Sequence, residues 1–362
     1  MKRVGIVGGG QLARMLALAG HPLGVRCRVL DPSDRPSAGE VAEHVQGGFE
    51  DIDALRRLAE GVDVVTYETE GVPTAASEEL AQHAPLLPHP RALSVASDRL
   101  EEKRFLRGLG LATAPFVRVE SFADLEIAIE RIGFPLVLKT RRHGYDGRGQ
   151  AVIARSSDAP AAWERLGPSA LIAEAFIRFE RELSVVAVRS TSGALRAYPL
   201  VENLHREGIL VWTLAPAPRV DAAMQGAAEA IAASIMESLD YVGVLTVEMF
   251  QCGGELVVNE IAPRVHNSGH WTIEGAATSQ FENHLRAILS LPLGSTSPHG
   301  ASVSVNLLGE VPEIDQILAL PDTHVHLYGK VSRPRRKIGH VTLRAGSHDE
   351  ARQRLECLMR LS

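Results

Sequence analysis

The chain has 362 residues, of which 45% are hydrophobic and 23% are charged, and its formal net charge is −6. This length predicts two or three domains with well-buried cores, and the acidic balance argues against a general nucleic-acid-binding protein. The three cysteines are far apart and form no CxxC pattern, which fits a reducing, cytoplasmic compartment and offers no zinc site. No stretch approaches the roughly 18 apolar residues of a membrane-spanning helix, so we expect no membrane association.

The first 90 residues alternate between short strands and helices. An apolar strand over residues 3–7 leads into Gly8-Gly9-Gly10, a helix over residues 11–19 and a second strand that ends at Asp31. The spacing Gly8-x-Gly10-x-x-Ala13, with an acid about twenty residues later, matches the dinucleotide-binding fingerprint. This pattern leaves two interpretations open: NAD binding, or a doubly wound domain whose glycine turn binds something else.

The same alternation continues to a cluster of prolines. We expect helices near residues 51–60 and 74–83, a strand over residues 62–66 and a short strand at residues 86–87. The segment Tyr67-Glu68-Thr69-Glu70 follows a strand, at the edge where open parallel sheets bind ligands. Prolines at positions 85, 88 and 90 place a first domain boundary near residue 90.

The next unit contains a lysine at a strand exit and a glycine-arginine loop. Residues 92–108 are predicted to form a charged helix and residues 122–132 an amphipathic helix. Lys139 lies near the end of a strand over residues 134–140, and residues 141–150 combine three glycines with three arginines. Glycines let backbone N–H groups approach closely and cations offset negative charge, so this loop is predicted to lie over phosphates.

A hairpin over residues 244–258 and the polar run after it carry the strongest chemical signal. Glycines between two β-rich runs predict its turn. A three-residue loop at residues 253–255 would place Glu248 opposite Glu260, whereas a two-residue loop would place Asn259 there. Paired carboxylates repel unless a cation lies between them, and Mg²⁺ binds such oxygens together with phosphate and water. Two solvated acids are the alternative, but a structural hairpin has no need of the polar residues that follow: Arg264, His266, Asn267, Ser268 and His270.

A Pro-, Ser- and Gly-rich break at residues 291–300 marks a second boundary, and the tail beyond it is predicted to be rich in strands. The run 329–337 contains the cations Lys330, Arg333, Arg335, Arg336 and Lys337. In an acidic protein, this local positive site fits a compact anion such as a ribose phosphate better than DNA. A solvated basic turn stays open as the alternative.

Together, the lysine-ended strand, the glycine-arginine loop and the hairpin acids resemble the ATP-grasp superfamily. Within it, Gly8-Gly9-Gly10-Gln11-Leu12, residues 144–150 and the long motif over residues 259–272 are similar to the N5-carboxyaminoimidazole ribonucleotide synthetase family. The resemblance covers essentially the whole chain. It implies a mixed α/β and α+β fold with three domains: a Rossmann-like, doubly wound preATP-grasp domain (1–90), an ATP-grasp domain (91–292) with its lid at about 112–178, and a small β-rich C-terminal domain (293–362).

The resemblance further implies an ATP-dependent ligase of purine biosynthesis. It would consume ATP, bicarbonate and 5-aminoimidazole ribonucleotide, pass through carboxyphosphate, and form N5-carboxyaminoimidazole ribonucleotide. The glycine turn would then receive the ribonucleotide instead of NAD. Mg²⁺ is the implied metal, held by Glu248 and Glu260, and a cytoplasmic homodimer is the implied state.

The family's site residues carry over position by position. Those implied to bind the nucleotide and its metal are Arg99, Lys139, Gly144, Tyr145, Asp146, Gly147, Arg148, Gly149, Gln150, Glu174, Ala175, Phe176, Ile177, Glu182, His205, Asn259 and Glu260. Those implied to face bicarbonate, the acceptor amine and the transferred carboxyl are Tyr145, Asp146, Arg148, Arg264, His266, Asn267, Ser268 and His270. Those implied to hold the acceptor are Gln11, Leu12 and Glu70 at its ribosyl part, with Lys330, Arg336 and Lys337 at its phosphate.

Two other functions stay open on the sequence. A formate-dependent ATP-grasp glycinamide ribonucleotide transformylase would share the scaffold, and a nicotinamide-dependent oxidoreductase would rest on the glycine fingerprint alone. Two positions depart from the family pattern. Ala262 stands where many ATP-grasp enzymes have an asparagine that binds metal, and Arg335 stands where the family has a small residue. A third protein ligand to Mg²⁺ and the role of Arg335 are therefore undecided.

Overall fold

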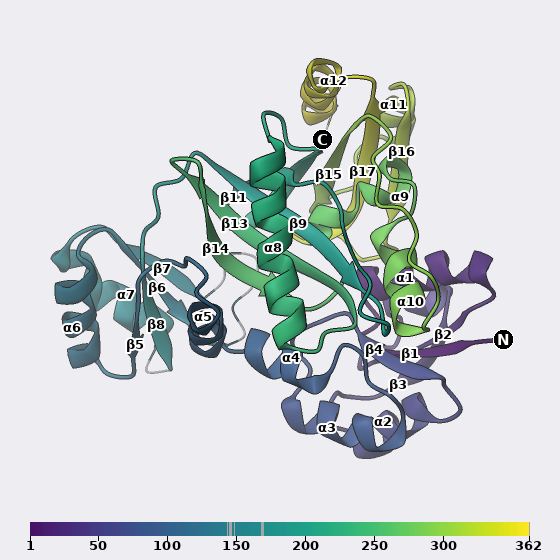
Figure 1. Cartoon of the computed structure of the whole chain (residues 1–362), viewed down its shortest axis with the longest axis horizontal. Coiled ribbons are helices and arrows are strands. Elements are labelled where there is room, and N and C mark those ends of the chain that lie inside the picture. Colours follow the sequence, from purple (N-terminus) through teal and green to yellow (C-terminus); the bar gives the residue numbers. More distant parts are fainter. Residues whose placement is uncertain (143, 145–146, 148, 168–169, 362) are drawn as a thin grey trace.

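A computed structural model describes residues 1–142, 144, 147, 149–167 and 170–361 of the chain. It contains three sheets, which lie in an N-terminal unit, a projecting lid and a large central unit (Figure 1). Within the described residues, no helix has the length and apolar character needed to cross a membrane.

The N-terminal unit is a parallel sheet with helices on both faces. Its strands are β1 (Arg3–Val7), β2 (Arg26–Asp31), β3 (Glu43–Gln46) and β4 (Val64–Tyr67), in the order β3-β2-β1-β4. Helix α1 (Gln11–Gly20) packs on one face, whereas α2 (Ile52–Ala59) and α3 (Thr74–His83) pack on the other. The predicted doubly wound arrangement is confirmed.

Two details of this unit differ from expectation. Strand β3 was not predicted, because only one of its four residues is apolar and it lies at the sheet edge. The strand predicted at residues 86–87 is wrong: Leu86 makes only an isolated parallel bridge to Val65.

The segment predicted as one helix over residues 92–108 is two helices, α4 (Pro90–Ala96) and α5 (Arg99–Gly108). Asp98 separates them because its side chain accepts a hydrogen bond from Leu100 N–H and caps the start of α5. The same carboxylate receives two hydrogen bonds from Arg141, at 2.9 and 2.7 Å. Asp98 therefore joins α5 to the exit of the lid strand that precedes Arg141.

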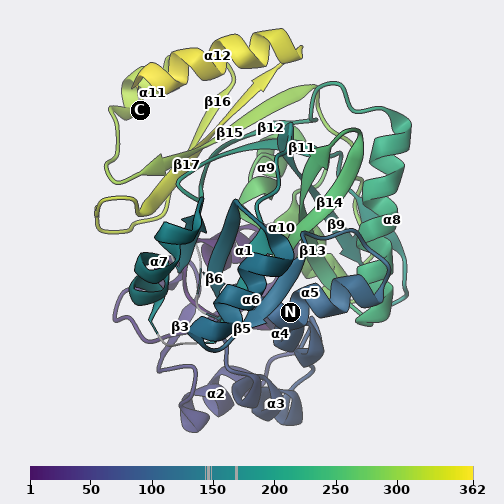
Figure 2. The same cartoon turned by 90° about the vertical axis from the view of Figure 1, so that its left-hand side faces the viewer.

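The lid is a small antiparallel sheet covered by two helices (Figure 2). Its strands are β5 (Phe116–Val119), β6 (Leu136–Thr140), β7 (Gln150–Ile153) and β8 (Leu171–Ala175), in the order β5-β8-β6-β7. Helices α6 (Phe122–Ile132) and α7 (Ala159–Leu166) bury the apolar side of this sheet, including Leu136, Leu138 and Ile153.

The central sheet has nine strands and runs from the hairpin into the C-terminal region. The order is β14-β13-β9-β11-β12-β15-β17-β16, with β10 paired to β9. The strands are β9 (Arg181–Arg189), β10 (Leu195–Ala197), β11 (Val201–Arg206), β12 (Ile209–Ala215), β13 (Gly243–Cys252), β14 (Glu255–Ala262), β15 (Ala301–Leu308), β16 (Thr323–Leu327) and β17 (Lys337–Ala345). The helices are α8 (Ala222–Ser238), α9 (Thr272–Gly275), α10 (Gln280–Ile288), α11 (Ile314–Leu318) and α12 (His348–Leu361). Since β12 pairs with β15, one sheet crosses the predicted boundary at residue 293, and the domain bounds stay a prediction.

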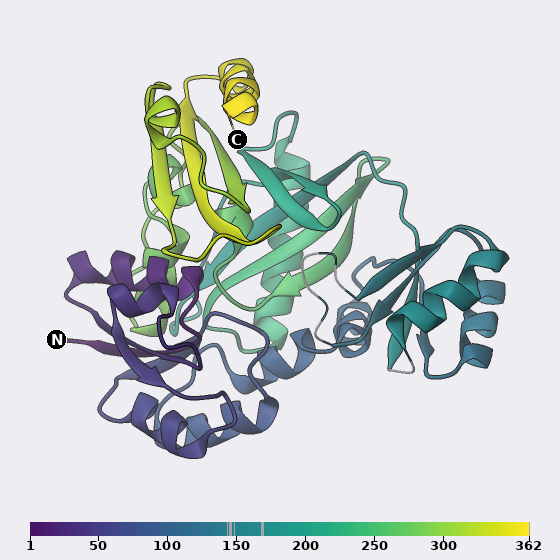
Figure 3. The ribbon, with the colours of Figure 1, turned by 180° about the vertical axis from the view of Figure 1, so that it is seen from behind.

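The N-terminal unit and the C-terminal hairpin β16–β17 are neighbours in space, as the view from behind shows (Figure 3). Ser37 Oγ donates a 2.6 Å hydrogen bond to the carbonyl of Tyr328, which follows β16. This contact brings the edge of the first sheet, where ligands were expected, next to the basic run of the tail.

A buried histidine joins the N-terminal unit to the centre. Val244 N–H donates to His284 Nδ1 (3.1 Å), so the proton of the neutral ring lies on Nε2, which is 2.9 Å from Thr66 Oγ1. The ring is fully buried, and burial lowers the pKa of His284 to about 3. Protonation of Nδ1 would remove the acceptor for Val244 N–H.

We therefore expect acid to destabilise the protein through His284. Below pH 6.5 the unfolded chain binds a proton that the folded chain does not, so stability falls as the pH is lowered. Between pH 7 and pH 5 this histidine should account for about 2 kcal/mol of the lost free energy of unfolding. The glutamine of His284→Gln does not titrate, and its amide offers both an acceptor and a donor. Urea unfolding at the two pH values should therefore show a smaller loss of the free energy of unfolding in this variant than in the parent, by that amount. The exposed His299→Gln is the control, and equal drops in parent and His284→Gln would contradict the assignment.

Candidate active site

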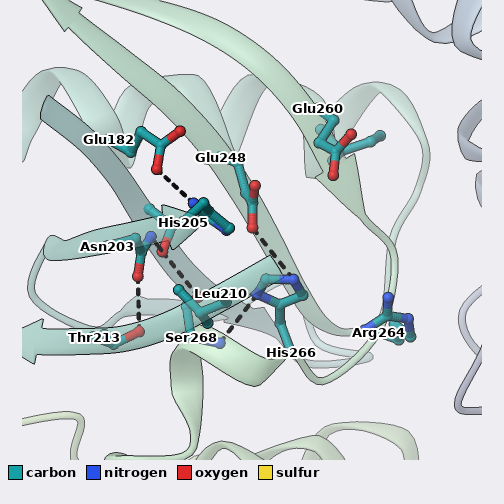
Figure 4. Close-up of polar contacts among 12 residues, drawn as sticks. Glu182, Asn203, His205, Leu210, Thr213, Glu248, Glu260, Arg264, His266 and Ser268 are labelled. Atoms are coloured by element: carbon teal, nitrogen blue, oxygen red, sulfur yellow. Dashed lines mark hydrogen bonds and ion pairs between the residues drawn. The ribbon is translucent and has the colours of Figure 1, made fainter. Parts of the chain in front are cut away.

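The paired acids lie opposite each other on neighbouring strands. The β13–β14 turn has two residues, Gly253 and Gly254, both with positive φ, and Cys252 pairs with Glu255. The three-residue loop expected for this pairing is therefore wrong. Glu248 nevertheless pairs with Glu260, because a β-bulge at Asn259 adds one residue to β14. The carboxylates lie on one side of the sheet (Figure 4).

The surroundings of the two carboxylates differ. Burial and the neighbouring Glu260 raise the pKa of Glu248, which His205 only partly offsets. Burial acts in the same direction on Glu260, but Arg99, whose Nη1 lies 2.8 Å from Glu260 Oε2, outweighs it and holds the pKa of this carboxyl below its usual value. A second cation between the acids would relieve the repulsion that Glu248 experiences.

A cluster of buried charges stands beside this pair. Lys139 Nζ and Lys103 Nζ lie 3.0 and 3.4 Å from the same oxygen of Glu174. Burial opposes the charge on Glu174, but the two lysines outweigh it and lower the pKa of that carboxyl to about 2. Glu174 Oε1 is buried and has no partner among the described residues, so this acceptor is available to a ligand.

An open cleft of about 540 Å³ begins at the end of the lid strand β8. Ala175, Phe176 and Ile177, the segment predicted to hold adenine, line it together with Phe134 and Val257. Phe176 is 42% exposed and Phe134 is equally exposed. Large apolar side chains left open at the junction of lid and central sheet suit a planar base.

A chain of buried hydrogen bonds leads to His266 (Figure 4). Thr213 Oγ1 donates to Asn203, Asn203 Nδ2 donates to Ser184, and Ser184 Oγ donates to Ser268. Ser268 Oγ lies 2.9 Å from His266 Nδ1, which also accepts from Ser268 N–H at 3.3 Å.

Because a backbone amide can only donate, the proton of the neutral His266 ring lies on Nε2. That atom is 3.3 Å from Glu248 Oε1. Burial, with further contributions from Arg264 and Lys337, lowers the pKa of His266 well below its ordinary value. Neutral His266 therefore presents an N–H to a carboxylate of the pair. Its supporting residues Ser184, Asn203 and Thr213 were not predicted, since polar residues inside a strand give no local signal of their partners.

Glu182 and His205 form a second polar pair above the sheet (Figure 4). Glu182 Oε2 lies 2.5 Å from His205 Nδ1. Burial opposes the charge on the imidazole, but the hydrogen bond that His205 donates to Glu182 outweighs it and raises the pKa of His205. The two predicted nucleotide contacts thus come together on β9 and β11.

The predicted acceptor residues gather from three distant parts of the chain. Lys330 Nζ donates to Gln11 Oε1 at the start of α1, and Arg264 Nη2 lies 2.8 Å from Glu70 Oε1. Arg264 Nε is buried and has no partner among the described residues. Burial, opposed by Glu68, lowers the pKa of Lys330 to about 8.

The carboxylate of Glu68 occupies the N-terminus of α1, a role that the sequence analysis missed. It accepts hydrogen bonds from Gly10 N–H and, at 2.8 Å, from Ala13 N–H. A Cβ atom at Gly8 or Gly10 would lie 2.5 Å from atoms of this side chain, so the glycine pattern makes room for Glu68. The position of Glu68 directly after a buried strand was the available signal. A pyrophosphate at this helix end would meet the carboxylate, which argues against the nicotinamide interpretation.

The other predicted residues are more dispersed. Leu12 is buried in the core, Arg336 donates to the carbonyl of Val331 within its own loop, and Lys337 begins β17. Asn267 Nδ2 is buried without a partner among the described residues. His270 is fully buried and stacks on His340, with ring centroids 4.5 Å apart, so it lies behind the polar run.

The glycine-arginine loop is only partly described. Tyr145, Asp146 and Arg148 lie outside the described residues. Gly144 O accepts a 3.0 Å hydrogen bond from Arg99 Nη2, and Gly149 O accepts from Thr140 N–H at 2.8 Å. Gln150 begins β7 opposite Lys139, and a Cβ atom at Gly147 would clash with the carbonyl of Glu207.

Arg335 is the residue of the basic run that departs from the family pattern. It forms an exposed ion pair with Glu207 at 2.5 Å. Glu207 lies in the turn between β11 and β12, which is the segment that also contacts Gly147. Arg335 is thus directed toward this turn, whereas Lys330 contacts Gln11.

The acid pair fits Mg²⁺ as a partial ligand set. Among the described residues, no group of three or more His, Cys, Asp or Glu side chains is arranged to hold a metal ion. The two carboxylates repel each other, and the cations Arg99 and Lys139 stand close by. This arrangement matches an ion that takes its remaining ligands from phosphate oxygens and water. Ala262 supplies no oxygen from its side chain.

A lid, a central antiparallel sheet with paired acids, and a preceding parallel unit define an ATP-grasp enzyme, an ATP-dependent ligase. Sequence models of three domain families match the chain: the ribonucleotide synthetase preATP-grasp domain over residues 1–97, the ATP-grasp domain over residues 104–281, and the phosphoribosylaminoimidazole carboxylase C-terminal domain over residues 302–354.

Relatives match over nearly the full length. The N5-carboxyaminoimidazole ribonucleotide synthase of Pseudomonas aeruginosa is 47% identical over 353 residues, which cover 98% of this chain and 97% of that protein. The chain belongs to the N5-carboxyaminoimidazole ribonucleotide synthase family. The crystal structure of the Thermus thermophilus synthetase is 54% identical with a TM-score of 0.95, covering 99% of this chain and 98% of that one. The Aspergillus clavatus synthase, solved with ADP and 5-aminoimidazole ribonucleotide, is 35% identical with a TM-score of 0.93, covering 99% and 98%.

Proposed function

We propose that the chain carboxylates 5-aminoimidazole ribonucleotide to N5-carboxyaminoimidazole ribonucleotide in purine biosynthesis, with ATP and bicarbonate as co-substrates. The observation that carries this proposal is the convergence of three distant segments. Gln11 and Glu70 of the N-terminal unit meet Lys330 and Arg264, beside the acid pair. A ribonucleotide held there would have its reacting amine near the nucleotide's phosphates.

The proposed reaction has two steps. A bicarbonate oxygen attacks the γ-phosphorus of ATP, which releases ADP and forms carboxyphosphate. The acceptor amine then captures the carboxyl carbon, the bond from that carbon to the phosphate oxygen breaks, and the nitrogen loses a proton. Arg264 is placed to offset the charge of the carboxyl group, and neutral His266 can donate from Nε2.

The nucleotide site is assigned by charge and shape. Lys139 and Arg99 would offset phosphate charge, and the cleft at Phe176 would hold the base. Mg²⁺, when bound to Glu248 and Glu260, would neutralise charge on the transferring phosphoryl group. Water must be excluded because carboxyphosphate hydrolyses easily, which gives the lid its purpose. A cytoplasmic homodimer stays an expectation from the family.

ADP release with MgATP should require both bicarbonate and the aminoimidazole ribonucleotide. With ¹³C-bicarbonate, the label should appear in the carboxyamino group of the product in NMR spectra. The control replaces these substrates with formate and glycinamide ribonucleotide, which should release no ADP above background. ADP release with formate and glycinamide ribonucleotide, and none with bicarbonate and the aminoimidazole ribonucleotide, would favour the transformylase alternative.

A further inference from the structure

The position of Glu260 depends on an irregularity in an edge strand. Counting from the two-residue turn, regular pairing would set Asn259 opposite Glu248. The bulge shifts the partner to Glu260. β14 is the first strand of the central sheet, so no other named strand pairs with its outer side. On that side Val258 makes an isolated bridge to Thr113, and its N–H donates to the carbonyl of Ala112 at 2.8 Å. This bridge lies at Val258, one residue before the bulge, so the backbone groups of Asn259 and Ile261 need other partners.

Two adjacent side chains of α5 make the contacts that a neighbouring strand would otherwise make. Lys103 Nζ donates a 2.6 Å hydrogen bond to the carbonyl of Asn259, the extra residue of the bulge. Glu102 Oε1 accepts a 2.6 Å hydrogen bond from Ile261 N–H, directly after Glu260. Both side chains are 2% exposed, so water does not compete for these bonds.

Helix α5 is itself anchored at its first turn. Asp98 caps it and binds Arg141, and Arg99 N–H donates to the carbonyl of Arg141 at 2.9 Å. The first turns of the helix also make the contacts to β14. Arg99 pairs with Glu260, Glu102 binds Ile261 N–H, and Lys103 binds the carbonyl of Asn259. In Figure 1, α5 lies between the lid and β14.

We propose that Glu102 and Lys103 are positioning residues that hold the Asn259 bulge and thereby set Glu260 opposite Glu248. They act through the backbone of β14. This inference rests on the proposed function only for its consequence, the metal site, because the register itself is a property of the protein alone.

The first test measures the register without metal or nucleotide. Glu102→Leu keeps the size of the side chain and removes the acceptor, so hydrogen–deuterium exchange at the Ile261 amide should become about tenfold faster or more. Glu102→Gln keeps an oxygen acceptor and should exchange like the parent. Glu101→Gln, on the exposed side of the same helix, is the matched control.

The second test measures metal binding directly. Mn²⁺ is titrated in the presence of ADP and followed by electron paramagnetic resonance. Glu102→Leu should weaken Mn²⁺ binding by about 10- to 100-fold, as loss of a supporting shell does at other metal sites, and Glu102→Gln should restore most of it. If Glu102→Leu does not fold, Lys103→Met serves instead, since Lys139 still pairs with Glu174, and it should also weaken Mn²⁺ binding.

The outcomes separate the two proposals. Parent-like exchange at Ile261 in Glu102→Leu overturns the positioning role, whatever the metal does. Glu260→Ala is the reference for the metal site. If Glu260→Ala binds Mn²⁺ as tightly as the parent, the metal assignment fails, while the exchange data still decide whether Glu102 holds the bulge.

Discussion

Replacing Glu260 with alanine should lower turnover by about 100-fold or more with all substrates saturating. The carboxylate faces Glu248 across the β13–β14 pair and holds Arg99 at 2.8 Å. Its removal takes away one of the two acids proposed to bind Mg²⁺. It also frees Arg99, which Glu260 holds in place in the parent. The measurement is kcat for ADP release, together with the Mg²⁺ concentration that gives half of the maximal rate, which should rise.

The control for this prediction lies on the same strand. Glu255 is exposed at the turn end of β14, so Glu255→Ala should keep the parent's turnover. Glu260→Ala with turnover near that of the parent would remove Glu260 from the metal site and leave the acid pair without a catalytic role.

Replacing Lys330 with alanine should raise the apparent KM for the ribonucleotide by about 10- to 100-fold, if the contact to the acceptor's phosphate is worth about 1.5–3 kcal/mol. Lys330 reaches Gln11 in the N-terminal unit, while Lys139 and Arg99 lie at the separate site proposed for the triphosphate. The KM for ATP should therefore change little. Saturation curves for each substrate provide the measurement.

The pKa of Lys330 adds a second signature. Burial lowers it to about 8, so the ammonium loses its charge as the pH rises through that value. In the parent, the KM for the ribonucleotide should therefore increase above pH 8, and this increase should be absent in Lys330→Ala. Arg333→Ala removes one charge from the same loop and should leave both KM values near those of the parent. A higher KM for ATP, with that for the ribonucleotide unchanged, would assign Lys330 to the nucleotide.

The family, the fold class and the ligase activity were within reach of the sequence because their signals are local. The doubly wound unit follows from alternating strands and helices, and the motif over residues 259–272 is long enough to identify the family. The glycine fingerprint was the misleading signal. Its NAD interpretation fails in three dimensions because Glu68, brought from the end of β4, fills the helix end that a pyrophosphate would need.

Residues 92–108 were not divided into two helices, although the cap at Asp98 is a local signal. The bonds from Arg141 that also hold Asp98 come from the lid and could not be read from this segment. Nor could it reveal that the C-terminal strands extend the central sheet through the pairing of β12 with β15.

The sequence by itself determined which side chains are present for chemistry: the paired acids, the lysine at the strand exit, the polar run after the hairpin and the basic tail. Tertiary structure decided how they face one another. Turn length alone would set Asn259 against Glu248, and the observed pairing requires a bulge whose backbone is held by Glu102 and Lys103. Lys330 and Gln11 are separated by 319 positions and still touch. The physical reason is that register and long-range contact depend on hydrogen-bond partners from other elements, which periodicity along one segment does not encode.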